Sequence, residues 1–326
     1  MALIFLLLIG TLAARPFAAR IAERDFPPPG RLLDVGGRHA HIHCTGSGTP
    51  TILLESGLDT RGSWSWAGLR NELSQTSRVC AYDRAGILWS EPGEGQRDSE
   101  HIAGELHALL DAASEAPPYV MVGHSVGGLH VRVYDERYPG EVLGFVFVDP
   151  SHPEQDDRFP AEVREQMARA NSFSLVGWIF NVMAPYRVMI EHDTPNTAYF
   201  WRSFPTVQRE AAAIKASSEQ ASRAGSLGDR PVVVLTAGKP LSMSGISDQG
   251  VAAMQQTWLE LHDELAALSS NSDHRVVEGA GHYIHVDRPE AVVAAVCDVV
   301  IAVREGGRVR RSRPLLDVRE SPHSCR

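Results

Sequence analysis

One short stretch constrains the fold more than any other. Residues 119–122 form an apolar run, and the pentapeptide GHSVG at 123–127 follows it directly. Residues 128–138 have helical character, and Pro139 ends the predicted helix because proline cannot continue one. A strand, a G-x-S-x-G turn and a helix in this order predict a tight turn that exposes the central serine hydroxyl. Ser125 is therefore the candidate nucleophile.

The same turn predicts hydrogen-bond donors beside the serine. The first N–H groups of a helix lack partners within it, so the Val126 N–H is one candidate oxyanion-hole donor. A second is the Leu58 N–H, because residues 55–58 follow a buried apolar strand at 51–54. A plain strand-to-helix turn is the alternative for this loop. Glu55, an unusual charge in such a strand, is either hydrogen-bonded in the site or turned to solvent.

A serine hydroxyl attacks only when a histidine accepts its proton and a carboxylate orients that histidine. His282 lies in a glycine-rich turn after the last predicted strand, and Asp149 ends the apolar strand at 142–148. Asp248 is the alternative acid, although it also suits the start of a helix. Asp149 is favoured, because catalytic groups gather at the carboxyl ends of neighbouring parallel strands.

Residues 151–230 form one long excursion between two predicted core strands. They are rich in aromatic residues and methionine and lack strand alternation, which predicts short helices that cover the site as a cap. The apolar side chains either form the core of the cap or also line a substrate pocket. The candidate pocket residues are Trp178, Phe180 and Met183.

The ends of the chain differ from its body, which is predicted to comprise 25–150 and 231–304. Residues 1–24 contain an apolar run too short for a clear membrane span, followed by arginines. This segment predicts a membrane anchor or an export signal. The alternative is that the segment forms a buried amphipathic helix. In that case it is not a targeting signal, and the protein is expected in the cytoplasm. The polar, arginine-rich residues 305–326 are predicted to be disordered.

Composition narrows the class of partner. The chain is 43% hydrophobic and 22% charged, as expected of a folded globular protein. A net charge of −9 provides no basic surface for nucleic acid. The four cysteines form no C-x-x-C pair and have no histidine at zinc-ligand spacing, so a structural metal is not expected.

Four motifs together resemble those of the α/β-hydrolases, in particular the serine-esterase-like group. They are LLESG at 53–57, YDRAG at 82–86, GHSVGG at 123–128 and the pair Gly281-His282. The resemblance runs from about residue 31 to 303, apart from the cap. It implies a mostly parallel eight-stranded sheet with flanking helices, and a helical cap inserted after the strand ending at Asp149. It also implies hydrolysis through an acyl-enzyme without a cofactor.

The sequence departs from the group at three places. Ser56 stands where a histidine usually precedes the glycine of the oxyanion loop, and Leu88 replaces a glycine after the YDRAG motif. The penultimate strand, which ends near Thr236, is followed by no carboxylate. Asp83 and Arg84 are expected to brace the loops around the site rather than to react.

The leading function is hydrolysis of carboxylic esters of apolar small molecules. The same three residues would also serve a cofactor-free perhydrolase or haloperoxidase, in which peroxide replaces water. A ligand-binding protein without turnover is the alternative from another class. Dehalogenases and epoxide hydrolases of this fold fit less well, because they carry an aspartate where Ser125 stands. Substrate identity and oligomeric state stay open.

The expected sheet also brings two cysteines together. The strand ending at Cys44 should lie antiparallel beside the strand containing Cys80, at the end of the sheet remote from Ser125. We expect Cys44 and Cys80 to be the pair that forms a disulfide if the protein is in an oxidising compartment. The alternative is that they are two small buried side chains in neighbouring strands. Cys297, on a predicted helix, is expected to stay reduced.

Overall fold

A computed structural model describes residues 2–171, 174–190, 192–241 and 244–310. One eight-stranded sheet organises them, in the order β1-β2-β4-β3-β5-β6-β7-β8. The strands are β1 (Arg31–Asp34), β2 (His39–Thr45), β3 (Thr51–Glu55), β4 (Val79–Tyr82), β5 (Tyr119–His124), β6 (Val142–Val148), β7 (Val232–Ala237) and β8 (Ser272–Val277).

The sheet is parallel except at one edge. β1 pairs with β2 and β2 with β4 in antiparallel fashion, whereas all pairings from β4 to β8 are parallel. The turn between β1 and β2 uses Gly36 and Gly37 at φ +66° and +88°, a region that favours glycine. The predicted mostly parallel eight-stranded sheet is confirmed.

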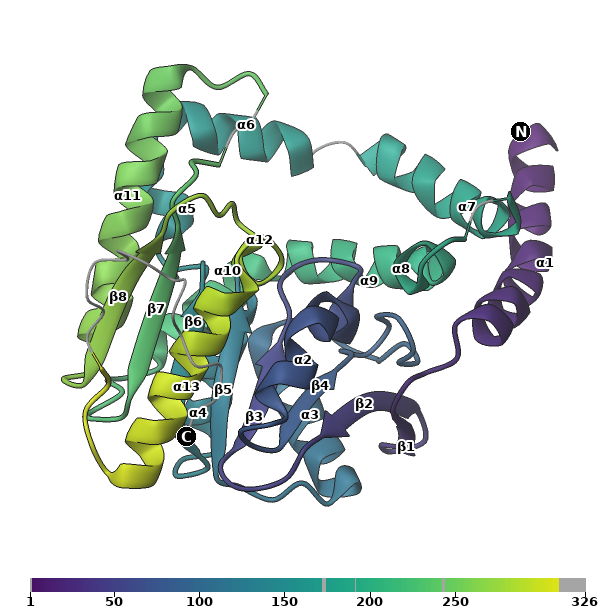
Figure 1. Ribbon diagram of the computed structural model, residues 1–326. Helices are drawn as coiled ribbons and strands as arrows, with labels where there is room; N and C mark the ends of the chain where they lie inside the picture. Colours follow the sequence, from purple (N-terminus) through teal and green to yellow (C-terminus); the bar gives the residue numbers. More distant parts are fainter. Residues whose placement is uncertain (1, 172–173, 191, 242–243, 311–326) are drawn as a thin grey trace.

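Helices cover both faces of the sheet, as Figure 1 shows. On one face lie α2 (Ala67–Leu73), preceded by the short helix η1 (Gly62–Trp66), and α13 (Pro289–Glu305). The other carries α3 (Ser99–Ala113) and α4 (Gly127–Arg137). The central strands β3, β5 and β7 are buried along their whole length, because helices exclude water from both sides. α11 (Asp248–Ala267) packs beside β7 and β8.

The chain between β6 and β7 is helical, as predicted. This helical insertion, residues 151–230, lies at the carboxyl ends of the parallel strands (Figure 1). Its helices are α5 (Gln155–Arg158), α6 (Ala161–Asn171), α7 (Ser174–Ile190), α8 (Pro195–Ala198), α9 (Phe200–Ala212) and α10 (Ile214–Arg223). α12 (Ile284–Asp287) follows β8 at the same end of the sheet.

The N-terminal segment forms α1 (Ala2–Asp25), which lies beside α7 and away from the sheet (Figure 1). The Thr11 hydroxyl donates to the backbone carbonyl of Val182 across 3.2 Å. At the C-terminal end of α1, the carboxylate of Asp25 lies 2.9 Å from Nε2 of His192. Among the helices of the described residues, none combines the length and the apolar character needed to cross a bilayer.

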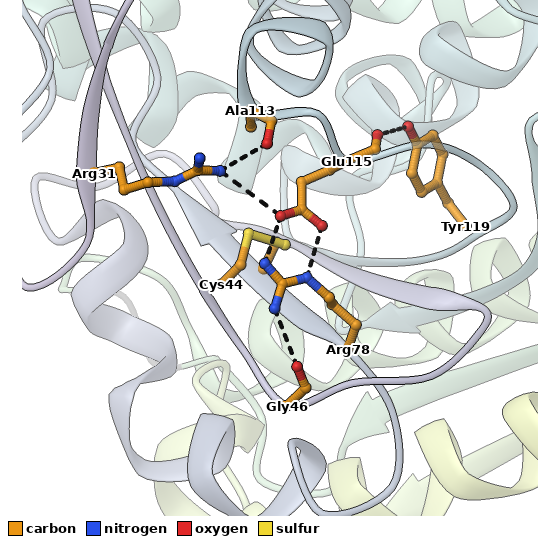
Figure 2. Close-up of a disulfide and its surroundings, with 8 residues drawn as sticks. Arg31, Cys44, Gly46, Arg78, Ala113, Glu115 and Tyr119 are labelled. Atoms are coloured by element: carbon orange, nitrogen blue, oxygen red, sulfur yellow. Dashed lines mark hydrogen bonds and ion pairs between the residues drawn. A yellow bond between two sulfur atoms is a disulfide. The ribbon is translucent and has the colours of Figure 1, made fainter.

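Cys44 and Cys80 are joined by a disulfide between β2 and β4 (Figure 2). They are direct cross-strand partners, with Cα atoms 4.0 Å apart. Beside them, Glu115 accepts two hydrogen bonds from the guanidinium of Arg78, at 2.8 and 2.6 Å.

The expectation that Cys297 stays reduced is wrong, because Cys297 is disulfide-bonded too. The side chain of Cys297 on α13 is only half-buried, so a cysteine from another segment can reach its sulfur. Within the described residues no cysteine is free.

Candidate active site

Ser125 occupies the tight turn between β5 and α4, as the pentapeptide predicts. Its backbone adopts φ +53°, in the left-handed region, so the turn projects the side chain above the sheet. Two glycines allow this close approach. A Cβ atom at Gly123 would lie 2.8 Å from the carbonyl oxygen of Gly127, and one at Gly127 would lie 2.8 Å from that of Ser56.

His282 connects the serine to an acid. Its Nε2 lies 3.0 Å from Oγ of Ser125, and its Nδ1 lies 2.6 Å from Oδ2 of Asp149. A carboxylate can only accept, so the proton of a neutral ring sits on Nδ1 and Nε2 is left to accept from the serine hydroxyl. The structure therefore brings together Ser125, His282 and Asp149, the three residues that the sequence predicted as the candidate catalytic group.

Asp149 is held on both carboxylate oxygens. While Oδ2 faces His282, Oδ1 accepts hydrogen bonds from the backbone N–H of Ala237 at 2.9 Å and from the indole N–H of Trp258 at 3.0 Å. Burial acts to raise the pKa of Asp149. The opposing effects are the hydrogen bond from His282, the electrostatic interaction with His262 and the hydrogen bond from Ala237. Together they outweigh burial and hold the pKa of Asp149 below its usual value. The alternative acid, Asp248, instead begins α11 at an exposed position.

The two predicted oxyanion donors flank the serine. Leu58 and Val126 line the same pocket as Ser125, and neither backbone N–H has an acceptor among the described residues. The loop carrying Leu58 packs directly on the turn. A Cβ atom at Gly57 would lie 3.0 Å from Cβ of Ser125 and 2.8 Å from Nδ1 of His124.

A cavity of about 250 Å³ opens beside Ser125. Its apolar walls come from the core and from the helical insertion, and they include Leu58, Val126, Phe159, Met167, Ile214, Leu241, Met254 and Trp258. A larger hollow, of about 1260 Å³, lies between α1, the β1–β2 turn, α3 and α9, and none of the three candidate catalytic residues lines it.

The pocket prediction for Met183 is wrong. Met183 is half-exposed on α7 and does not line the cavity beside Ser125. The side chains of Trp178 and Phe180 lie outside the described residues. Met167 and Ile214 line the cavity instead. Composition alone could not separate these residues, because an apolar side chain can face either the pocket or a neighbouring helix.

Two buried histidines support the loop of His282. His124 directly precedes the candidate nucleophile, and its Nε2 donates to the backbone carbonyl of His282 at 3.0 Å. Its ring centroid lies 4.6 Å from that of His285, which stacks on Trp66 at 4.3 Å. Burial lowers the pKa of His124 well below its usual value and that of His285 to about 3, so both rings are neutral at pH 7.

One group of possible metal ligands occurs within the described residues. It consists of Cys44, Cys80 and Glu115. The two sulfurs are joined in the disulfide, so they are not available as thiolate ligands. We therefore assign no metal to this group.

Comparison with known proteins agrees with the fold. An uncharacterized protein of Bacillus subtilis (strain 168), YqjL, is 26% identical over 257 residues, which cover 79% of this chain and 86% of that protein. A putative lipase of Acinetobacter baumannii AYE has a TM-score of 0.61 at 18% identity, covering 89% of this chain and 97% of the lipase. An esterase of Thermogutta terrifontis has a TM-score of 0.54 at 20% identity, covering 83% and 97%.

The likeness to these two solved structures establishes the fold alone, since both identities are low. The family is established by sequence. A model of the alpha/beta hydrolase family matches residues 41–295, which contain Ser125, Asp149 and His282 as well as the helical insertion. The chain therefore belongs to the alpha/beta hydrolase family.

Proposed function

We propose that the protein is a serine hydrolase that cleaves carboxylic esters of apolar small molecules through an acyl-enzyme. Ser125 is the nucleophile, His282 the general base and Asp149 the acid that orients His282. The observation that carries the proposal is the hydrogen-bonded chain from Ser125 Oγ through His282 to Asp149, at 3.0 and 2.6 Å, at the wall of an apolar cavity.

The geometry supports a two-step reaction. The Ser125 oxygen attacks the ester carbonyl while its proton passes to Nε2 of His282. The N–H groups of Leu58 and Val126 stabilise the negative oxygen of the tetrahedral intermediate. Collapse of the intermediate transfers the proton from His282 to the leaving alcohol. Water, deprotonated by the same histidine, then hydrolyses the acyl-enzyme.

The cavity supports the substrate class. Its walls are mostly apolar, with few polar groups besides the candidate catalytic residues. Its volume of about 250 Å³ lies just under the range typical of sites for drug-sized ligands. We infer that the helical insertion acts as a cap, and that the cavity accepts an acyl chain or an alcohol of short to medium length.

Labelling with a fluorophosphonate probe and hydrolysis of p-nitrophenyl esters test the proposal. We expect Ser125→Ala to abolish labelling and to lower kcat by several orders of magnitude, without loss of the fold. Ser151→Ala is the matched control, because Ser151 is a buried serine that lines the same cavity, and it should still label. Near-wild-type hydrolysis by Ser125→Ala would overturn the mechanism.

The same measurements separate the alternatives. A perhydrolase would form peracetate from acetate and hydrogen peroxide, in a reaction that also requires Ser125. A ligand-binding protein without turnover would neither label nor hydrolyse any ester in the series. Fold alone does not decide among these chemistries, because one fold hosts many reactions.

A further inference from the structure

Arg84, two residues beyond the end of β4, is buried at the junction of the core and the helical insertion. Each of the five N–H groups of its guanidinium has an acceptor. Nη1 donates to Glu55 at 2.5 Å and to the backbone carbonyl of Ser56 at 2.8 Å. Nη2 donates to the carbonyl of Gly57 at 2.8 Å, and Nε and Nη2 hold the two carboxylate oxygens of Glu210 at 2.9 and 2.7 Å.

The bond to Gly57 bears on the site. A trans peptide is planar, with its C=O and N–H pointing in opposite directions. The carbonyl of Gly57 and the N–H of Leu58 belong to one peptide. By holding the Gly57 carbonyl on the side of the buried charges, Arg84 directs the Leu58 N–H to the opposite side, where Leu58 lines the cavity with Ser125.

Residue 57 needs this restraint. Glycine has more backbone freedom than any other residue, and here no side chain fits, because a Cβ atom would lie 3.0 Å from that of Ser125. Within the loop, the Gly57 carbonyl accepts a hydrogen bond from the Asp59 N–H at 3.0 Å. Arg84 adds a restraint from outside the loop, because it binds the carbonyls of residues 56 and 57.

Glu210 brings the helical insertion into this arrangement. It lies on α9, is 2% exposed, and reaches across to the core to bind Arg84 with both carboxylate oxygens. Arg97, also buried, lies 3.8 Å from the same carboxylate. On the core side, Glu55 accepts from Arg84 and from the hydroxyl of Tyr82. One guanidinium thus joins the end of β3, the oxyanion loop and the insertion.

We propose, on the basis of the proposed serine hydrolase, that Arg84 is a positioning residue that orients the Leu58 N–H for the oxyanion, and that Glu210 couples this orientation to the helical insertion. A buried ion pair adds little net stability compared with apolar packing. Its contribution is to geometry, because the planar guanidinium of Arg84 fixes the positions of several acceptors at once. In this proposal the insertion covers the pocket and also helps to determine the orientation of the Leu58 N–H in the oxyanion hole.

Three variants test the proposal. Arg84→Lys keeps the charge but loses the fork, whereas Glu210→Gln weakens the bonds between Arg84 and the insertion, together with the ion pair to Arg97. Arg230→Lys is the matched control, because Arg230 also holds a carboxylate, that of Asp135, and two backbone carbonyls, at the amino end of β6. For each we would measure the melting temperature, kcat and KM on a p-nitrophenyl ester, and affinity for a trifluoromethyl ketone.

The ketone reports on the oxyanion directly. Ser125 adds to its carbonyl carbon, the serine proton passes to His282, and the carbonyl oxygen becomes the anion that Leu58 and Val126 bind. Loss of a whole oxyanion donor costs about 10²–10³-fold in kcat, so a misdirected one should cost about 10–100-fold. We expect Arg84→Lys to lower kcat by about 10–100-fold while KM stays within about twofold of the wild-type value. The affinity for the ketone should fall in parallel with kcat.

Glu210→Gln should do the same to a smaller extent, and Arg230→Lys should lower only the melting temperature. If Arg84→Lys does not fold, Glu210→Gln carries the test. The proposal is overturned if kcat and ketone affinity in the foldable variants equal those of Arg230→Lys. Failure of the proposed hydrolase is a separate result, because the wild-type protein would then show no hydrolysis that depends on Ser125.

Discussion

The indole N–H of Trp258 lies 3.0 Å from Oδ1 of Asp149, the carboxylate oxygen that does not face His282. Trp258 therefore holds the proposed acid from α11, while His282 contacts the other carboxylate oxygen. Removing one hydrogen bond to a charged group costs about 1.5–3 kcal/mol, or about 10–100-fold. Because Ala237 still donates to the same oxygen, we expect Trp258→Phe to lower kcat by about 10-fold.

A matched control isolates this bond. The indole N–H of the buried Trp89 donates to the backbone carbonyl of Phe26 at 2.9 Å, outside the cavity. Trp89→Phe should lower the melting temperature and leave kcat unchanged. Equal kcat in the two variants would show that the Trp258 bond has no part in the reaction.

The choice between the two acids gives a second prediction. Asp149→Asn should lower kcat by about 10⁴-fold, the scale seen when a triad carboxylate becomes an amide that favours the wrong histidine tautomer. Asp248→Asn should change kcat little, because Asp248 lies at an exposed helix start. Steady-state kinetics on one p-nitrophenyl ester measures both, and the reverse order would assign the role to Asp248.

The cavity predicts a chain-length preference. We expect kcat/KM to rise from acetate to mid-length acyl esters, as apolar surface is buried, and to fall once the chain exceeds about 250 Å³ of space. Ile214→Ala, which enlarges the cavity, should move the optimum to longer chains. Val207→Ala on α9, outside the cavity lining, should not move it. A preference for acetate or for charged esters would contradict the prediction.

His285 predicts acid sensitivity of the fold. Burial lowers its pKa to about 3 from the ordinary 6.5, so between these pH values the unfolded state takes up a proton that the folded state does not. The free energy of unfolding therefore falls as the pH drops from about 6.5 toward 3. His285→Phe, which keeps the ring on Trp66, should reduce this fall.

Thermal unfolding measured from pH 7 to pH 4 checks the prediction. Val286→Ala, which changes an exposed residue without a titratable group next to His285, is the control and should leave the pH dependence as it is in the wild type. An unchanged slope in His285→Phe would mean that other groups govern acid unfolding.

The disulfide gives the last prediction. Cys44 and Cys80 are 36 residues apart, and closing a loop of that length stabilises a fold by about 4 kcal/mol in the chain-entropy view. The double variant Cys44→Ala/Cys80→Ala should melt at a lower temperature with kcat unchanged, because the bridge lies near the amino end of β4, whereas Ser125 follows the carboxyl end of β5. Peptide mapping without reductant checks the bridge itself, and free thiols at both positions would rule it out.

Local pattern made much of this site predictable. The strand, turn and helix around Ser125 lie within about twenty residues, and each is specified by its own sequence. The order of Ser125, Asp149 and His282 followed from the positions of strand ends, which a parallel sheet aligns at one edge. The sequence also suggested a bracing role for Arg84.

Other features depend on tertiary placement. The partner of Arg84, Glu210, is 126 residues away on a helix whose position no local pattern determines. The Trp258 bond to Asp149 spans 109 residues and needs the packing of α11 against the sheet. Met183 was misassigned for the same reason: apolar character indicates burial of some face, but not which neighbour that face meets.

Because the proposed acid, Asp149, lies at the end of β6, the end of β7 does not need to carry a catalytic carboxylate. Ala237 contributes a backbone N–H, which any residue except proline provides, and Lys239 and Leu241 beyond it line the cavity. The pocket wall and the proposed acid thus belong to different strands. For directed evolution, codon randomisation at 239 and 241 would explore substrate scope while the reacting groups stay as they are.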